Sequence, residues 1–410
     1  MEKYKRYPGI MVKAFISALL LMAVVCLSPT CAFGEETAEN GTEELDVNEI
    51  MDRQYQSNEI RNIQEELEKR TSSEVNDILQ DYDPRSIIQD AATGNFELSV
   101  KGIAGNALRY LFKEIYTNLG ILIKLIILIV LCALLRNLQT SFLSEGVSEI
   151  AFYVCYIVIV SVLLVSFSTA MQMGMSMIDG MVDFMYATTP VLITLLVSGG
   201  NLTSGGIFQP LMLMIVEVSA TIMRNVFIPM IFLSTILSIV SNISDKIQIS
   251  RLTAMLKQIT AWALGAILTV FIAVVSLQGS FGAVIDGVTS KTAKFAIGTF
   301  IPVVGKTLAD AADTVIGCTL LIKNAAGLAV MVGILIICIV PLLKILALVA
   351  LYKAASALVE PISEKRITNC ISDVAGSMVY IFGIAAAVGF MFLISITALI
   401  SAGNLSAMIR

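Results

Sequence analysis

The stretch AAGLAVMVGILIICIVPLLKILALVAL, residues 325–351, decides the class of this protein. Lys344 is the only charged residue in it. A helix of about 20 apolar residues is long enough to cross the hydrocarbon core of a bilayer. The run therefore predicts a membrane-spanning helix, and the same pattern recurs along the chain.

The composition agrees with this interpretation. Of the 410 residues, 57% are hydrophobic and 14% are charged, with a mean hydropathy of +0.84. Soluble domains are about 25% charged. We predict an all-α, polytopic helical membrane protein whose apolar spans lie at 119–138, 150–170, 184–198, 207–223, 226–241, 259–278, 325–351 and 378–401.

Residues 1–34 have the layout of a signal peptide. A basic start precedes the apolar run 14–27, and the small residues Ala32 and Gly34 suit a cleavage point before Glu35. The apolar run is too short to span comfortably. We expect a cleaved signal, with an uncleaved anchor as the alternative. Either outcome exports the segment that follows.

The exported segment, residues 35–117, is acidic, with a net charge of −11. Its beginning, EETAENGTEELDVNEI, has no aromatic residue and favours disorder. Helical periodicity follows, and we expect an amphipathic helical region whose apolar face carries Ile60, Ile63, Leu67, Val75, Ile78 and Leu79. The multi-span membrane domain occupies residues 118–410.

The basic loops predict the orientation. If the N-terminal region is extracytoplasmic, the loops 136–149, 242–258 and 352–375 are cytoplasmic. They carry Arg136, Lys246, Arg251, Lys257, Lys353, Lys365 and Arg366. The opposite loop, 171–183, carries two aspartates and no base, in agreement with the positive-inside rule. Lys291 and Lys294 argue mildly against this orientation.

Comparison of the chain with itself suggests a tandem parallel internal repeat. At an offset of 112 residues Pro190 meets Pro302, Pro229 meets Pro341, and Gly205 meets Gly317. The repeats would be 144–242 and 244–361, with an extra helix at 378–401. Chance alignment of apolar segments is the competing explanation. Glycines and Pro302 interrupt the region 280–324, for which we expect a re-entrant or interfacial element.

The sequence offers no equipment for catalysis. It has no histidine, which removes histidine bases and most zinc and haem sites. No cysteine pair has C-x-x-C spacing, and no segment supplies a basic face for nucleic acid. Gly305-Lys306-Thr307 imitates the end of a phosphate loop, but Phe300 stands where its first glycine belongs. We expect no cofactor, no metal, no nucleic-acid partner and no enzymatic activity.

Charged residues inside apolar surroundings are the candidate functional residues, because each is expensive against lipid. Glu217 and Arg224 lie two turns apart on one helical face, as a polar pathway or a pairing contact; a helix end at Arg224 is the alternative. A second charged face follows Pro302, and an ordinary solvated face is its alternative. The candidates for lining a pathway or a docking surface are Pro190, Glu217, Arg224, Pro302, Lys306, Asp310 and Asp313.

The run FIPVVGKTLADAADTVIGCTLLIKNAAG (300–327), together with TTPVLITLLVSGG (188–200), resembles the stage III sporulation protein AE family. The resemblance extends over nearly the whole chain. It implies a non-enzymatic component of a secretion-like channel complex in the mother-cell membrane around the forespore. It also implies an ATPase, small membrane proteins, ring-forming proteins and a forespore-side protein as partners.

Two other functions remain as alternatives. A self-sufficient secondary transporter would have its site at the repeat interface, in a closed polar pocket that holds Glu217, Arg224 and the 306–313 face. A purely structural membrane scaffold would scatter these charges over surfaces that face partners.

Overall fold

The computed structural model describes residues 58–71, 73–79, 83, 87–88, 100–142, 145–243, 249–300 and 305–409. Two short helices, α3 (Asn58–Arg70) and α4 (Ser73–Asn76), precede the long ones. The signal segment and the acidic start of the exported region lie outside the described residues. The expectations for them stay predictions.

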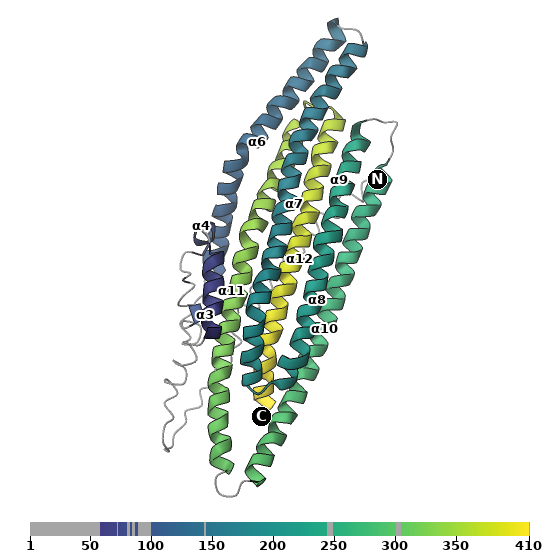
Figure 1. The fold of residues 1–410 in the computed structure, drawn as a ribbon. Helices are drawn as coiled ribbons and strands as arrows, with labels where there is room; N and C mark the ends of the chain where they lie inside the picture. Colours follow the sequence, from purple (N-terminus) through teal and green to yellow (C-terminus); the bar gives the residue numbers. More distant parts are fainter. Residues whose placement is uncertain are drawn as a thin grey trace.

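Long helices form the rest of the described chain (Figure 1). They are α6 (Val100–Phe142), α7 (Glu145–Ser198), α10 (Ser250–Phe300), α11 (Gly305–Val359) and α12 (Lys365–Ile409). Between α7 and α10 a continuous helical run combines the π-helices η2 (Ser204–Phe208) and η3 (Met223–Phe227) with α8 (Gln209–Ile222) and α9 (Ile228–Ile243). Every element named here is helical, as predicted for an all-α membrane protein.

The described residues contain six helices long and apolar enough to cross a membrane, where the sequence suggested eight segments. The expected spans 150–170 and 184–198 are parts of α7, and 207–223 and 226–241 belong to one run. Our interpretation separated them at an acidic loop over 171–183 and at a helix end beside Arg224, but α7 and η3 continue the helix through both. The ion pair between Asp179 and Arg224 gives a charged residue of each stretch a partner inside the bundle.

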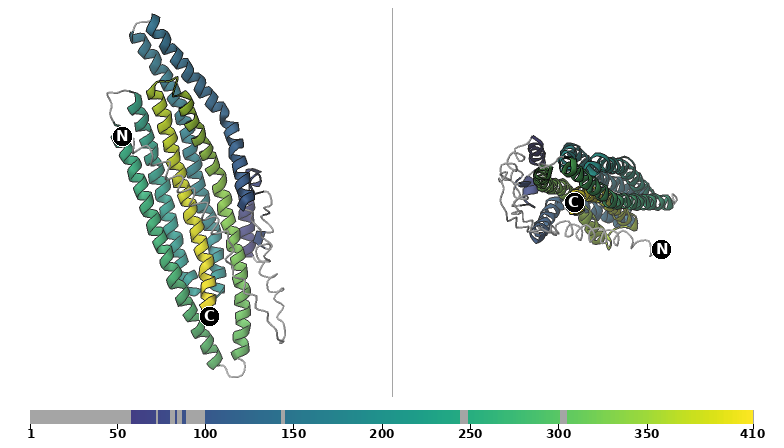
Figure 2. Two further views of the ribbon diagram at one scale, coloured as in Figure 1. Left: turned by 180° about the vertical axis from the view of Figure 1, so that it is seen from behind. Right: turned by 90° about the horizontal axis from the view of Figure 1, so that it is seen from below.

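The helices run alternately up and down (Figure 1, Figure 2). The C-terminal ends of α6, α9 and α11 lie toward one end of the bundle, and those of α7 and α10 lie toward the other (Figure 1). The three basic loops of the sequence therefore share one side of the bundle, as we expected. At 1.5 Å per residue α11 is about 80 Å long, against a hydrocarbon core of about 30 Å. Much of the bundle must therefore project from the bilayer.

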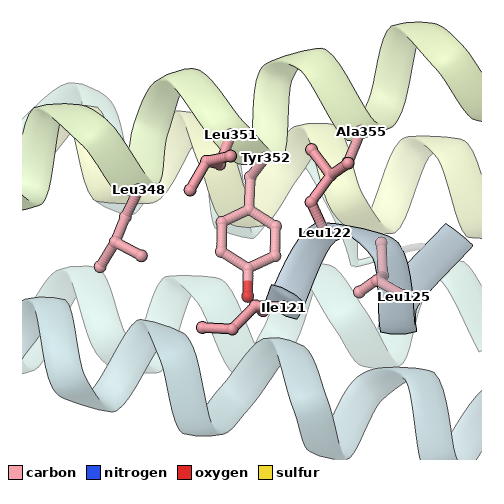
Figure 3. A pocket seen from close by; sticks show the side chains of 7 residues that line it. All are labelled: Ile121, Leu122, Leu125, Leu348, Leu351, Tyr352 and Ala355. Carbon is pink, nitrogen blue, oxygen red and sulfur yellow. The ribbon is translucent and has the colours of Figure 1, made fainter. Parts of the chain in front are cut away.

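Helix α12 is the centre of the bundle and contacts α7, α9, α10 and α11. Its small residues allow this, since Gly389 packs on Cys338 of α11 and Ile381 packs on Gly174 of α7. Helix α6 lies at the edge, against α7 and α11. Figure 3 shows its seam with α11, where apolar side chains from both helices enclose a cavity of about 10 Å³ lined by Ile121, Leu122, Leu125, Leu348, Leu351, Tyr352 and Ala355.

Glycine does not interrupt the described part of the region 280–324. Helix α10 continues through Gly287 and Gly298 to Phe300, and α11 begins at Gly305. The two helix ends project together past the turn between α7 and η2 (Figure 1). Pro302 lies outside the described residues, so the re-entrant or interfacial element remains a prediction.

The proposed repeat remains a prediction. The pairs α7–α9 and α10–α11 both start at the basic end, descend and return, as a parallel repeat requires (Figure 1). The register fits less well. The first pair turns at 199–201, whereas the ends of the second pair, Phe300 and Gly305, align at the offset of 112 with Thr188 and Ile193 inside α7.

Candidate functional site

The apolar face of the exported segment is buried against the membrane helices. Ile60, Ile63 and Leu67 of α3 are each 1% exposed, and Val75, Ile78 and Leu79 are also buried. All six residues of the expected apolar face are therefore buried in the described structure. Helix α3 lies beside the middle of α11 and contacts both α7 and α11 (Figure 1).

Two glycines let α3 approach this closely. A Cβ on Gly333 of α11 would collide with Leu67 of α3 and with Phe184 of α7. A Cβ on Gly180 of α7 would lie 3.2 Å from a guanidinium nitrogen of Arg70. Small residues at helix contacts permit close packing of backbones inside membranes. The docking of α3 is thus encoded in the membrane helices as well as in α3.

A cavity of about 620 Å³ lies between α3–α4, α7 and α11. Its lining combines charged groups of the exported segment, hydroxyl and amide groups of α7 and the apolar side of α11. The lining residues are Glu66, Lys69, Arg70, Glu74, Val75, Thr169, Gln172, Met173, Ser176, Met177, Gly180, Ile336, Ile337, Val340, Pro341 and Lys344. We call it the lateral cavity.

Lys344, the one charged residue of the apolar run 325–351, is paired in this cavity. Its Nζ donates to both carboxylate oxygens of Glu74, each at 2.8 Å. The side chains are 24% and 44% exposed. A lysine within an apolar helix needs such a partner. On the rim, Lys69 donates to Glu66 at 2.7 Å, and this hydrogen bond raises the pKa of Lys69, which therefore stays charged.

Further contacts hold the stretch 58–79 to α6. Lys113 donates to Asp77 at 2.7 Å, and the Asn106 side-chain amide donates to the Ile78 carbonyl at 3.2 Å. This stretch is therefore joined to α6, α7 and α11. Its opposite side carries Arg61 and Glu65, which form an exposed ion pair at 3.3 Å.

Glu217 and Arg224 share one helical face, as predicted, but this face turns toward α7 and away from the lateral cavity. Arg224, within η3, forms an ion pair with Asp179 at 2.5 Å. Glu217 interacts with Tyr186 of α7. The Arg224–Asp179 pair is partly exposed, at 36% and 45%. Because η3 continues without a break into α9, the helix-end alternative for Arg224 is wrong.

The other candidates are not brought together in the described structure. Pro190 lies exposed inside the uninterrupted α7. Pro302 lies outside the described residues. The backbone of Lys306, Asp310 and Asp313 falls in the first turns of α11, and their side chains lie outside the described part. A shared pathway of all seven residues remains a prediction.

Sequence reasoning missed two charged groups. Glu74 looked like one acid among many in an acidic segment, and only the fold pairs it with Lys344. Lys323 is fully buried and donates to the Ile400 carbonyl of α12 at 2.9 Å. The position of Lys323 in an apolar run could have identified it from the sequence as a buried charge. In the described residues no group of three or more His, Cys, Asp and Glu could hold a metal ion.

The comparisons with known proteins match this architecture to one family. The family model for stage III sporulation protein AE matches residues 82–403. A protein of Bacillus subtilis (strain 168), stage III sporulation protein AE, is 35% identical over 361 residues, which is 84% of this chain and 90% of the relative. No solved structure matches. The chain therefore belongs to the stage III sporulation protein AE family.

Proposed function

We propose that this chain is a non-enzymatic integral membrane component of a sporulation-specific secretion or channel complex between mother cell and forespore. It would lie in the mother-cell membrane around the forespore, with its N-terminal region extracytoplasmic after signal cleavage. Other proteins of the stage III complex, including an ATPase and ring-forming proteins, are its proposed partners. The family relationship supports a role in sporulation, and the geometry suggests how the chain works in an assembly.

The observation that carries the proposal is the docked exported segment. Helices α3 and α4 bury their apolar face on α7 and α11 and keep charged residues on the other side, where Arg61 and Glu65 are exposed. An exported helix held in this way presents a fixed polar surface outside the membrane. Such a surface suits a partner in the space between the two membranes.

The self-sufficient transporter is the weaker alternative. It requires a closed polar pocket between the two helical pairs, with Glu217 and Arg224 inside it. Helix α12 occupies the space between these pairs, and 72% of its apolar window is buried. Glu217 and Arg224 instead contact α7 and are partly exposed. A purely structural scaffold remains an alternative. A measurement of export distinguishes it from our proposal.

The test is a charge exchange across the lateral cavity, with each variant as the sole copy in sporulating cells. Lys344→Glu and Glu74→Lys should each release α3–α4, reduce co-purification of the complex and lower the number of mature spores. The double exchange should restore both, because it rebuilds the ion pair. The control for a single charge reversal is Arg251→Glu, at an exposed position near the start of α10.

Three results would contradict the proposal. Normal spore numbers and normal co-purification in both single variants would remove the docked segment from the function. Normal assembly with blocked export would show that docking does not serve assembly. Substrate uptake by the purified chain alone in liposomes would favour the transporter.

A further inference from the structure

The turn between α7 and η2 carries a buried polar cluster that plays no part in the lateral cavity. Gly200 has a φ of 77°, a left-handed conformation that glycine adopts without strain, and it ends α7. Asn201 follows and is fully buried. The next helical run opens with the π-helix η2, and π-helical turns are frequent at functional sites.

Asp286 reaches this turn from α10. Its Oδ1 accepts from the Thr203 backbone N–H at 2.7 Å, and its Oδ2 accepts from the Ser204 N–H at 2.9 Å. The residue is 1% exposed. No lysine or arginine of the described chain forms an ion pair with it. The buried cation near this end, Lys323, donates to the Ile400 carbonyl. Asp286 is thus a buried negative charge held by two amide donors.

The side chains around Asp286 leave polar atoms without partners. These residues are 0–5% exposed, and the unpartnered atoms are Asn201 Oδ1, Ser204 Oγ, Gln209 Oε1 and Nε2, and Gln278 Oε1. A buried polar atom without a partner costs about 1–3 kcal/mol. One such atom is tolerable, but this many at one place indicates a ligand.

The backbone brings these groups into adjacent layers. Gly282 of α10 lies against Ser204, whose Oγ would be 2.8 Å from a Cβ at position 282. Along α10, Gln278 lies one turn before Gly282, and Asp286 lies one turn after Gly282. Gln209 follows Ser204 by one π-turn, since its backbone N–H donates to the Ser204 carbonyl. Carboxylate, hydroxyl and amide oxygens therefore line one contact between the turn and α10.

We propose that this cluster binds a monovalent alkali cation, Na⁺ or K⁺, with Asp286, Ser204 and Asn201 as its oxygen donors. The donors are hard oxygens, which suit alkali and alkaline-earth ions rather than transition metals. The site has one carboxylate, so a single positive charge neutralises it. A divalent ion would leave an excess charge in a buried site, which is expensive.

The experiment measures thermal unfolding of the purified full-length protein in detergent. Buffers contain NaCl, KCl or choline chloride at equal ionic strength. A ligand that binds only the folded state raises the melting temperature with its concentration. We expect a saturable rise with Na⁺ or K⁺ over choline. Ser204→Ala and Asn201→Ala should each weaken the apparent affinity about tenfold or more, because each removes an oxygen donor.

The matched control is Ser234→Ala, which removes another buried hydroxyl that already has a partner, the Thr253 carbonyl at 3.2 Å. It should keep the wild-type dependence on the cation. Equal melting temperatures of the wild type in all three salts would overturn the proposal and leave water as the partner of these groups. An unchanged cation dependence in both cluster variants would overturn it as well.

Discussion

Helices α10 and α12 are a matched pair with opposite environments. Their apolar windows have mean hydropathies of 2.2 and 2.4, yet 11% of the α10 window and 72% of the α12 window are buried. Helix α12 contains the run YIFGIAAAVGFMF (380–392), rich in small residues, and other helices surround it. Helix α10 exposes large side chains, with Trp262 at 75%. Hydropathy selects helices for the membrane, whereas side-chain size selects those for the centre.

The largest expected effect comes from removing a large buried side chain from α12, at the centre of the bundle. Phe392→Ala in α12 removes a ring that is 1% exposed and leaves a cavity, so it should lower the free energy of unfolding in mixed micelles by on the order of 3 kcal/mol. Trp262→Ala in α10 should change it by less than about 0.5 kcal/mol. Equal losses of unfolding free energy in both variants would contradict the different environments of α10 and α12.

Adding a methyl group to the packed centre of the bundle should have the next largest effect. A Cβ on Gly389 of α12 would lie 2.9 Å from the buried Cys338 sulfur, so Gly389→Ala should destabilise by about 1–3 kcal/mol. Gly265 of α10 has no atom within 4 Å of its Cβ position. Gly265→Ala should therefore stabilise by about 0.5–1 kcal/mol, because alanine is the better helix former. Denaturant titration of both variants checks the opposite signs.

A polar contact of α12 should contribute less. Asp373 accepts from the Ser238 hydroxyl at 2.5 Å and from the Asn242 amide at 3.1 Å, both on α9. Asp373→Ala should cost about 1.5–3 kcal/mol, the range for hydrogen bonds to a charged group, and partial exposure favours the lower end. Arg251→Ala, at an exposed position of α10, is the control and should be close to neutral. A neutral Asp373→Ala would leave apolar packing as the only link between α12 and α9.

The smallest perturbation uses the native protein. Trp262 is the only tryptophan of the chain, and it is exposed on α10. We expect lipids with brominated acyl chains to quench its fluorescence by more than about half, as direct contact with lipid requires. A brominated detergent is the control for access in micelles. Weak quenching in bilayers with strong quenching in detergent would show that protein covers α10 in the membrane.

Much of the fold followed from patterns along the chain. The helical class, the shared end of the basic loops and the six buried residues between Ile60 and Leu79 depend on local periodicity and charge. The shared face of Glu217 and Arg224 depends on it too. The count of spans failed because the polar stretch 171–183 and Arg224 ended spans in our interpretation, whereas both lie inside continuous helical runs. The ion pair between Asp179 and Arg224, which only the fold forms, gives their charges a partner.

The candidate site was less predictable. Lys344 stood out in its apolar run, but nothing in the sequence linked it to Glu74, which lies 270 residues earlier. Gly333 and Gly180 carry no local signal of a docking surface, because their role is to leave space for side chains of another segment. Asp286 likewise acts on a turn more than 80 residues away.

The sequence by itself determined that this chain is a helical membrane protein with an amphipathic N-terminal segment, because hydropathy and periodicity are local properties. The run 325–351 already required a membrane helix with one costly lysine. The tertiary structure decided what that lysine pairs with, which helix occupies the centre and where the amphipathic segment docks. Those outcomes depend on contacts between residues far apart in the chain, and only the folded packing of side chains brings them within reach.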